Sequence, residues 1–266
     1  MSDTSLFLIS REEHIKTITF NAPKKRNSLT PESALRVAEE VERSAGDGTR
    51  VLILTGAGGA FCAGADLASD HFSQVRSGSF PAEAEIDDMV NSTYHRLSRA
   101  VYGLPMPVIA AVDGVAAGFG CSLALLADIT LASSRAQFIE VFINIALIPD
   151  GGSTYILPKV VGMKKALEMV LTGDPVPAAE ALELGMVTRV YPPEELMDQA
   201  MVWARRLASG PVKSMGLARK TLFEAQQLPL REVLDLECRR QARLMTEPNF
   251  IHAVQAFFAK KKPTFS

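Results

Sequence analysis

One acidic residue stands alone in the stretch NIALIPDGGSTYILPKVVG. Asp150 follows an apolar run that closes in Pro149 and precedes the pair Gly151-Gly152. Pro-Asp-Gly is typical of turns, and an aspartate there readily bonds nearby backbone N–H groups or caps a helix. The alternative is a carboxylate that moves protons as a general acid or base. These residues alone leave both interpretations open.

Two other segments could stabilise negative charge, because they are rich in glycine and small residues. They read GAGGAFCAGADL and DGVAAGFGCSLALLAD, and each directly follows a short apolar run. Neither has the Gly-Lys-Ser/Thr ending of a P-loop or a clean Gly-x-Gly-x-x-Gly, so a nucleotide site is not indicated. Small residues at the start of a helix leave backbone N–H groups free in a positive potential. Two such turns facing each other would form an oxyanion hole.

The elements around these turns follow one plan. Residues 51–54 and 108–112 are apolar without alternation, as in strands buried on both faces. A glycine turn follows each run and a helix comes next, over residues 121–127 in the second case. DITLASS adds a third strand. Repeated strand, turn and helix units predict an α/β architecture.

The flanking segments have ordinary element signals. HIKTITFNAP alternates like a half-buried strand. A helix is predicted after it, with Thr30 as N-cap, Pro31 at its first position and apolar residues at helical spacing from residue 33 to 45. The polar stretch over residues 69–85 predicts a surface loop, followed by a helix over about 86–101. From about residue 163 to 260 the pattern is mainly helical.

Composition excludes several functions. The net charge is −2 and no basic stripe is interleaved with aromatic residues, so a small-molecule partner is expected rather than nucleic acid. Cys62, Cys121 and Cys238 are odd in number and lack metal-ligand spacing, which favours reduced thiols without a metal site. No leader sequence or apolar run of about 18 residues is seen. We therefore expect a cytoplasmic protein with no membrane partner.

Four motifs along the chain resemble those of a known family. FCAGADL and DGVAAGFGCSLALLADI, with KRNSL upstream and AFFAKKKPTF at the end, resemble the crotonase superfamily, the enoyl-CoA hydratase/isomerase family. The resemblance spans nearly the whole chain in the right order. It implies an α/β crotonase fold, a right-handed superhelix of ββα units with a helical C-terminal part. It also implies a spiral core over residues 1–200, a C-terminal trimerisation region over 201–266, and a homotrimer or dimer of trimers.

The resemblance assigns roles to the glycine turns. It implies that the backbone N–H groups of Ala65 and Phe119 bind the oxygen of an acyl-CoA thioester when it becomes an enolate. Phe119 departs mildly from the family pattern, because many members have glycine there. Coenzyme A is then part of the substrate, and no separate cofactor is expected.

Further residues match positions that bind the substrate in the family. Arg26 and Lys260 resemble groups that meet the CoA phosphates, the latter often from an adjacent subunit. The main chain around Ala63 and Asp66 resembles the adenine pocket. The expected substrate-binding set is completed by Leu67 and Phe142.

The acids distinguish the branches of the family. Enoyl-CoA hydratases have two glutamates, whose places are taken here by Ser122 and Phe142. Glu140, two residues before Phe142, would match only in a shifted register. Asp150 coincides with the acid of the Δ3,Δ2-enoyl-CoA, dienoyl-CoA and phenylacetate-pathway isomerases. A single carboxylate suffices to move a proton from the α- to the γ-carbon of a 3-enoyl-CoA.

Enoyl-CoA isomerisation by Asp150 is therefore the predicted activity. Hydration of 2-enoyl-CoA is the first alternative, although its proton-moving group is missing. A 4-chlorobenzoyl-CoA dehalogenase or thioester hydrolase using Asp150 and His95 is the second, because the spacing of His95 resembles that of the dehalogenase histidine. A lone histidine is weak evidence, and a surface role is the simpler interpretation. A non-catalytic acyl-CoA-binding or RNA-associated relative is the third.

Overall fold

Two β-sheets organise the chain, of which the computed structural model describes residues 6–265. The larger sheet has six strands in the order β1-β2-β3-β4-β6-β9, with β1 antiparallel to β2 and the other neighbours parallel. The smaller sheet has the order β5-β7-β8. The strands are β1 (Phe7–Glu12), β2 (Ile15–Phe20), β3 (Val51–Gly56), β4 (Val108–Val112), β5 (Val115–Ala117), β6 (Ile129–Ser133), β7 (Gln137–Ile139), β8 (Val176–Pro177) and β9 (Arg189–Tyr191).

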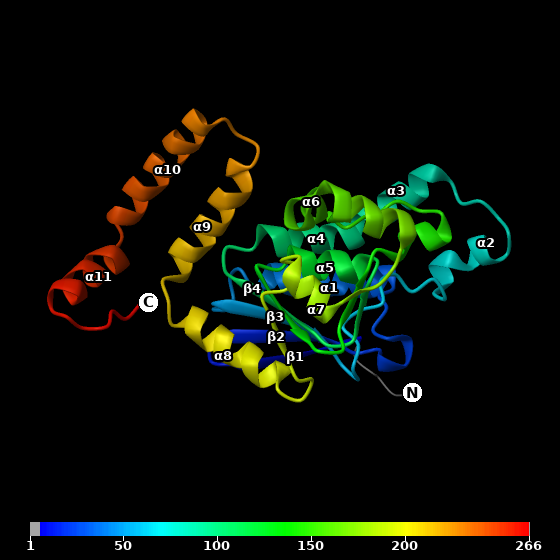
Figure 1. Cartoon of the computed structure of the whole chain (residues 1–266), viewed down its shortest axis with the longest axis horizontal. Helices are drawn as coiled ribbons and strands as arrows, with labels where there is room; N and C mark the ends of the chain where they lie inside the picture. The colour runs from blue at the N-terminus through cyan, green and yellow to red at the C-terminus, as the bar shows by residue number, and fades with distance from the viewer. Residues whose placement is uncertain (1–5, 266) are drawn as a thin grey trace.

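Helices cover both faces of the larger sheet. In Figure 1, α4, α5 and α6 lie above the strands and α8 lies below them. The helices are α1 (Pro31–Arg43), α2 (Ser73–Arg76), α3 (Glu83–Ser92), α4 (Tyr94–Gly103), α5 (Phe119–Leu126), α6 (Ser153–Thr172), α7 (Ala178–Glu183), α8 (Leu196–Ala208), α9 (Val212–Ala225), α10 (Leu230–Met245) and α11 (Pro248–Phe258), with 3-10 turns η1 (Pro23–Lys25), η2 (Asp70–Phe72) and η3 (Val141–Ile145).

The strand pairing shows a repeat, although not between the two units that were predicted. After β3 and the first glycine turn no helix follows directly in the described chain, and the next helical turn, η2, begins at Asp70. The chain runs β4, β5, α5 and then β6, β7, α6, and β4 pairs in parallel with β6 as β5 does with β7. Each unit thus adds one strand to each sheet before its helix. The short strand β5 lies inside the second glycine turn, where the sequence analysis expected only a turn.

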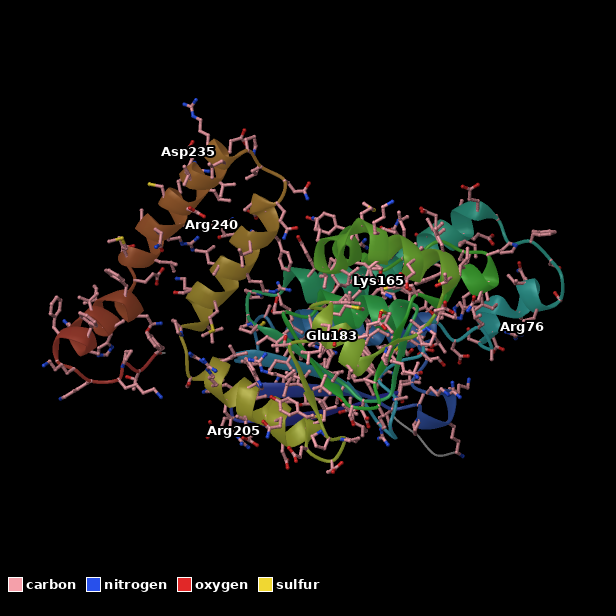
Figure 2. All side chains as sticks on the ribbon, viewed as in Figure 1. Arg76, Lys165, Glu183, Arg205, Asp235 and Arg240 are labelled. Carbon is pink, nitrogen blue, oxygen red and sulfur yellow. The ribbon has the colours of Figure 1, made fainter. Side chains whose placement is uncertain are left out.

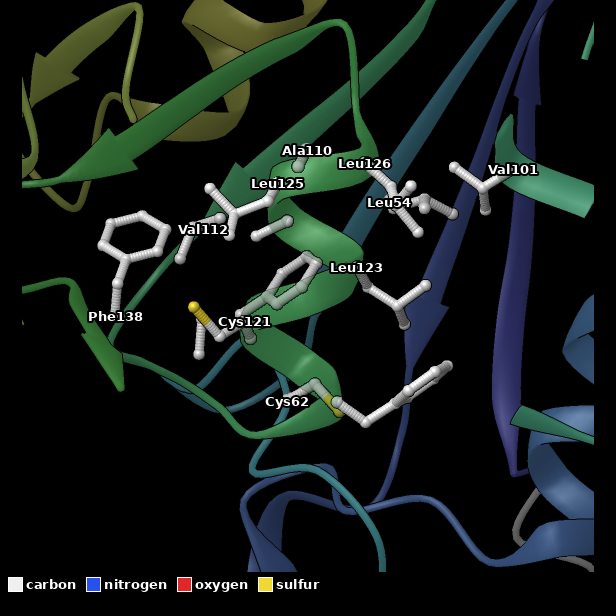
Figure 3. Packing of buried hydrophobic residues seen from close by; sticks show 14 of the residues in the cluster. Leu54, Cys62, Val101, Ala110, Val112, Cys121, Leu123, Leu125, Leu126 and Phe138 are labelled. Carbon is white, nitrogen blue, oxygen red and sulfur yellow. The ribbon is translucent and has the colours of Figure 1, made fainter. Parts of the chain in front are cut away.

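The absence of alternation in the central strands has a direct packing reason. In β3, Leu52 and Leu54 belong to the core cluster that includes residues of α1, α4 and α5, whereas Val51 and Ile53 belong to the cluster between the sheet and α8. Both faces of the strand are therefore buried. Figure 3 shows the first cluster around α5, with Cys121, Leu123 and Leu125 among side chains from the neighbouring strands.

Helix α1 begins as predicted. The hydroxyl of Thr30 accepts a hydrogen bond from the N–H of Ser33 at 3.1 Å, and Pro31 is the first helical residue. This bond satisfies one of the backbone donors that the first turn of a helix leaves unpaired.

We expect Thr30→Ala to lower the free energy of unfolding by about 1 kcal/mol, because the cap is lost. Urea denaturation measures the change. Thr30→Ser keeps the hydroxyl and should lose much less, so equal losses in the two variants would contradict the capping role.

The predicted helix over residues 86–101 is interrupted. Thr93 has φ −118° and ψ −85°, so α3 ends at Ser92 and α4 starts at Tyr94. The break turns Tyr94 and Leu97 into the core while α3 has no buried residue. Helical periodicity alone did not predict this change of direction.

The C-terminal helices leave the body of the molecule. In α8, Ala200 and Ala204 pack under the larger sheet, so the boundary expected at residue 200 falls inside a helix of the body. Helix α9 approaches the body at Gly216, where a Cβ would lie 1.8 Å from the carbonyl oxygen of Pro105. Figure 1 shows α10 and α11 extending beyond α9.

A side-chain contact joins the first two of these helices. Arg240 of α10, labelled in Figure 2, donates hydrogen bonds to Thr221 at 2.8 Å and to Glu224 at 2.5 Å on α9. The pair α9 and α10 is thereby fixed as a hairpin. Within residues 6–265, no helix is long and apolar enough to cross a membrane. The expectation that the chain has no leader sequence concerns residues 1–5 among others, and these lie outside the described residues.

Candidate active site

The two glycine turns meet at the start of α5. Cys62 forms a parallel bridge with Ala116, and the N–H of Ala117 donates to the carbonyl of Cys62 at 2.9 Å. Gly64 has φ +91°, and a Cβ there would lie 2.9 Å from the Ala117 oxygen and 3.4 Å from the Phe119 nitrogen. The turns approach so closely that only glycine fits between them.

This approach brings together the N–H groups of Ala65 and Phe119. Ala65 directly follows Gly64, and Phe119 is the first residue of α5, where helix geometry leaves an N–H unpaired. Within the described chain, neither N–H has a hydrogen-bond partner, whereas Asp66 donates to Leu29 at 2.8 Å. Two free donors, one of them at a helix start, are suited to a developing oxyanion.

The ring of Phe119 packs inside the protein. It meets the ring of Tyr94 edge to face at a centroid distance of 5.1 Å. A Cβ on Gly151 would lie 2.9 Å from this ring. The departure from glycine at residue 119 therefore supports the turn that carries Asp150.

The carboxylate of Asp150 does not shape this turn. The Asp150 carbonyl accepts hydrogen bonds from the N–H of Ser153 at 3.1 Å and from the Ser122 hydroxyl at 2.9 Å. Helix α6 has Gly152 as N-cap without a side-chain cap bond. The Oδ1 atom of Asp150 is buried and has no partner within residues 6–265. The interpretation of Asp150 as a helix cap is therefore wrong.

Burial also changes the acidity of this residue. Removal from water raises the pKa of Asp150 to about 6, because the ionised form loses hydration without gaining a charged or hydrogen-bonding partner. A carboxylate with such a pKa is ionised at neutral pH yet remains a better base than an exposed aspartate. Shifted acids of this kind are typical of proton-transfer sites.

Ser122 and Phe142, which occupy the positions of the hydratase glutamates, make structural contacts. Ser122 donates its hydroxyl to the Asp150 carbonyl, as described above. Phe142 is buried, and its ring lies 3.7 Å from the position of a Cβ on Gly118. Glu140 is fully buried and accepts a hydrogen bond from Ser153 at 2.5 Å. Neither Ser122 nor Phe142 can act as an acid or base.

His95 lies near the same turn without joining a catalytic arrangement. It borders a cavity of about 470 Å³ together with Gly151, Gly152 and Tyr155. Its Nε2 atom is buried without a partner among the described residues. Burial first, and then the positive charge of Arg99, lower the pKa of His95, so the ring is neutral at pH 7.

We expect His95→Gln to change the turnover of any thioester substrate by less than about twofold, because none of the described residues forms a hydrogen bond with the imidazole Nε2. Steady-state kinetics measure this. A fall of about 100-fold, the scale of a lost acid or base, would restore the hydrolytic alternative.

The candidate CoA-binding residues fall into two places. Ala63 donates its N–H to the Arg26 carbonyl at 2.9 Å, and the carboxylate of Asp66 pairs with Lys25 at 2.7 Å. Leu67 is 44% exposed at the edge of this patch. Lys260 instead follows α11, in the arm that extends away from the body (Figure 1). A single chain does not bring Lys260 to the other candidates.

Three residues of the site were not predicted from the sequence. Tyr94 donates its hydroxyl to the Leu29 carbonyl at 2.8 Å and packs on Phe119. Ser153 links Glu140 to the turn of Asp150, and Lys25 pairs with Asp66. These partners are far apart in sequence, so no local pattern signals them. Among residues 6–265, no cluster of three or more His, Cys, Asp or Glu side chains could hold a metal ion.

The repeated units, the two sheets and the facing glycine turns define a crotonase-fold protein. The family profile described as enoyl-CoA hydratase/isomerase matches residues 10–266. The chain therefore belongs to the enoyl-CoA hydratase/isomerase family of CoA-linked enzymes.

Individual relatives carry names of two activities. The chain is 38% identical to a 1,2-epoxyphenylacetyl-CoA isomerase from Escherichia coli strain K12, with 98% of each chain covered. It is 30% identical to a 2,3-dehydroadipyl-CoA hydratase of the same strain, again with 98% of each covered. A crystal structure of an enoyl-CoA hydratase from Bacillus anthracis superposes with a TM-score of 0.88 at 30% identity, covering 98% of this chain and 99% of that one.

Proposed function

We propose that this protein is an enoyl-CoA isomerase in which Asp150 moves a proton from the α- to the γ-carbon of an acyl-CoA thioester. The observation that carries the proposal is the buried, unpartnered carboxylate of Asp150, which lies at the turn packed on Phe119. Neither position of the hydratase glutamates holds an acid. One base beside two free N–H groups matches the needs of a 1,3 proton shift.

The steps follow from the positions of these groups. The N–H groups of Ala65 and Phe119 bind the thioester oxygen and stabilise the negative charge of the dienolate. Asp150 takes the α-proton, and the dienolate spreads its charge to the γ-carbon. The same carboxyl returns the proton there and gives the conjugated 2-enoyl-CoA. Each oxyanion donor lowers the barrier by about 3 kcal/mol.

The substrate-binding residues belong to the same proposal. Arg26, Ala63, Asp66 and Leu67 lie on one patch formed by the chain before α1 and the first glycine turn, which suits the CoA portion. Phe142 packs beside Gly118 and faces the acyl portion. Lys260 meets the CoA phosphates from a neighbouring subunit.

The oligomer proposed is a homotrimer or a dimer of trimers. Large apolar side chains on the C-terminal arm are exposed in the single chain, among them Leu230, Leu234, Phe257 and Phe258. Exposed apolar surface of this extent is typical of subunit contacts. The mass in solution, measured by light scattering, tests the assembly.

The activity test offers 3-enoyl-CoA and 2-enoyl-CoA separately and follows the conjugated thioester by absorbance. An isomerase raises the absorbance with the first substrate. A hydratase instead lowers it with the second, and a dehalogenase releases chloride from 4-chlorobenzoyl-CoA. CoA binding without turnover would favour the non-catalytic alternative.

The pH dependence has a fixed sign. Asp150 must be ionised to accept the α-proton, and burial raises its pKa to about 6. We therefore expect kcat to fall about tenfold for each pH unit below about 6 and to level off above it. Rates in buffers from pH 4.5 to 8 measure this, and an acid limb near pH 4 would contradict a buried base.

A further inference from the structure

Glu140 is a buried acid that the proposed reaction does not use. It lies between β7 and η3 and is fully buried. Its Oε1 accepts a hydrogen bond from the hydroxyl of Ser153 at 2.5 Å. Its Oε2 has no partner within residues 6–265. The thiol of Cys121 on α5 interacts with the same carboxyl. Burying a carboxyl group costs free energy of folding, so a functional role would explain its presence here.

Ser153 connects this carboxyl to the turn of Asp150. It is the first residue of α6, and its N–H donates to the Asp150 carbonyl while its hydroxyl donates to Glu140. Ser122 donates to the same carbonyl from the other side. The backbone of Asp150 is thus held by two donors, and none of the described residues donates a hydrogen bond to its carboxylate.

The direction of the Ser153 hydroxyl matters for the base. Serine side chains form hydrogen bonds with groups that lie close by in the sequence, and Asp150 lies three residues before Ser153. A hydrogen bond donated to a carboxylate stabilises its ionised form and weakens it as a base. Ser153, whose N–H donates to the Asp150 carbonyl, has Glu140 as the one acceptor of its hydroxyl within the described chain.

We propose that Glu140 is a positioning residue, which holds the Ser153 hydroxyl away from the Asp150 carboxylate and so keeps Asp150 an unpartnered base. The proposal deepens the isomerase function and rests on Asp150 as its base. Glu140 acts through Ser153 and does not touch the substrate.

Other titratable groups lie around Asp150, and burial shifts the pKa of those without an ion-pair partner. Burial raises the pKa of Tyr94, Cys62 and Cys121, and burial lowers the pKa of His95. Burial also raises the pKa of Glu140, and the charge of Asp150 adds to this rise. Asp66 is paired with Lys25. The titration that reports on the Ser153 hydroxyl is therefore followed at the carboxyl signal of Asp150 itself.

Four variants test the proposal: Glu140→Leu, Glu140→Gln, Ser153→Ala and the double variant Glu140→Leu/Ser153→Ala. The carboxyl carbon of Asp150 is titrated by 13C NMR, with its signal assigned by its loss in Asp150→Asn. The acid limb of kcat is measured alongside, with KM as the readout of substrate binding.

Glu140→Leu frees the hydroxyl, so the pKa of Asp150 should fall from about 6 to about 5 or below, on the scale of one charge-assisted hydrogen bond. At high pH the weaker base should lower kcat about threefold, with KM unchanged. The double variant lacks the hydroxyl and should return the pKa to about 6. Ser153→Ala alone should keep it there.

Glu140→Gln distinguishes the effect of accepting the Ser153 hydrogen bond from the effect of the negative charge of Glu140. Its amide oxygen still accepts from Ser153, so the pKa of Asp150 should stay near 6. An equal fall in Glu140→Gln and Glu140→Leu would mean that Glu140 acts by charge and would overturn the proposal. So would an unchanged pKa in Glu140→Leu, or a fall that the double variant does not reverse.

Glu140→Met replaces Glu140→Leu where the leucine variant does not fold, with the same expected fall. The NMR titration needs no turnover. If the protein fails to isomerise 3-enoyl-CoA, the proposed function is wrong, while the titration still decides the role of Glu140.

Discussion

Replacing Asp150 with asparagine should abolish isomerisation and at the same time make the folded protein more stable at pH 7. The loss of kcat is expected to be about 1,000-fold or more, because asparagine cannot accept the α-proton. No hydrogen bond of the carboxylate is lost within residues 6–265, since Oδ1 has no partner and α6 is not capped by this side chain.

The gain in stability follows from the raised pKa. Between about pH 4 and 6 the folded chain binds the Asp150 proton more tightly than the unfolded chain does, so ionisation opposes folding. This cost is absent below pH 4 and complete above pH 6, where it reaches about 3 kcal/mol. A buried amide has its own desolvation cost, so the net gain expected at pH 7 is about 1 to 3 kcal/mol.

Kinetics and urea denaturation measure the two effects. Asp174→Asn is the matched control, because Asp174 is exposed and should change neither quantity. A stable Asp150→Asn variant with full activity would remove Asp150 from the reaction. A variant that is less stable at pH 7 would show that the carboxylate has a structural partner.

The second large effect is expected for Gly64→Ala. A Cβ at residue 64 would lie 2.9 Å from the Ala117 oxygen and 3.4 Å from the Phe119 nitrogen, with φ at +91°. The two glycine turns must then separate, which moves the N–H groups of Ala65 and Phe119 apart. We expect kcat to fall about 100-fold, the loss seen when one oxyanion donor is removed.

Gly78→Ala provides the control for backbone strain alone. Gly78 has φ +80° and nothing lies within 4 Å of its Cβ position. This variant should lose about 1 kcal/mol of stability from the left-handed conformation and keep its kcat. Equal kinetic effects in the two variants would argue against a role for the contact between the turns.

The sequence predicted those parts of the fold that depend on local patterns. Thr30 and Pro31 marked the start of α1, and the uninterrupted apolar runs marked β3 and β4, because these signals lie within a few residues. The strands β5, β7 and β8 are two or three residues long and exist through pairing with distant segments. Such short strands have too few residues to show a period.

In the site, too, the sequence predicted what depends on local motifs and not what depends on tertiary contacts. The motifs indicated Asp150, Ala65 and Phe119, and the structure brings the last two together through Gly64. The state of the Asp150 carboxylate could not be predicted, because Pro-Asp-Gly is equally typical of a helix cap. The hydrogen bonds of Ser122 and Ser153 to its carbonyl decide the matter, and both depend on tertiary packing.

The central claim is that one carboxylate carries the proton from the α- to the γ-carbon. The direct measurement uses a 3-enoyl-CoA labelled with deuterium at the α-carbon and determines by NMR where the label is found in the first product formed. A single buried base predicts that part of the deuterium appears at the γ-carbon, because the carboxyl returns it before exchange with water. A γ-hydrogen derived entirely from solvent would contradict the account.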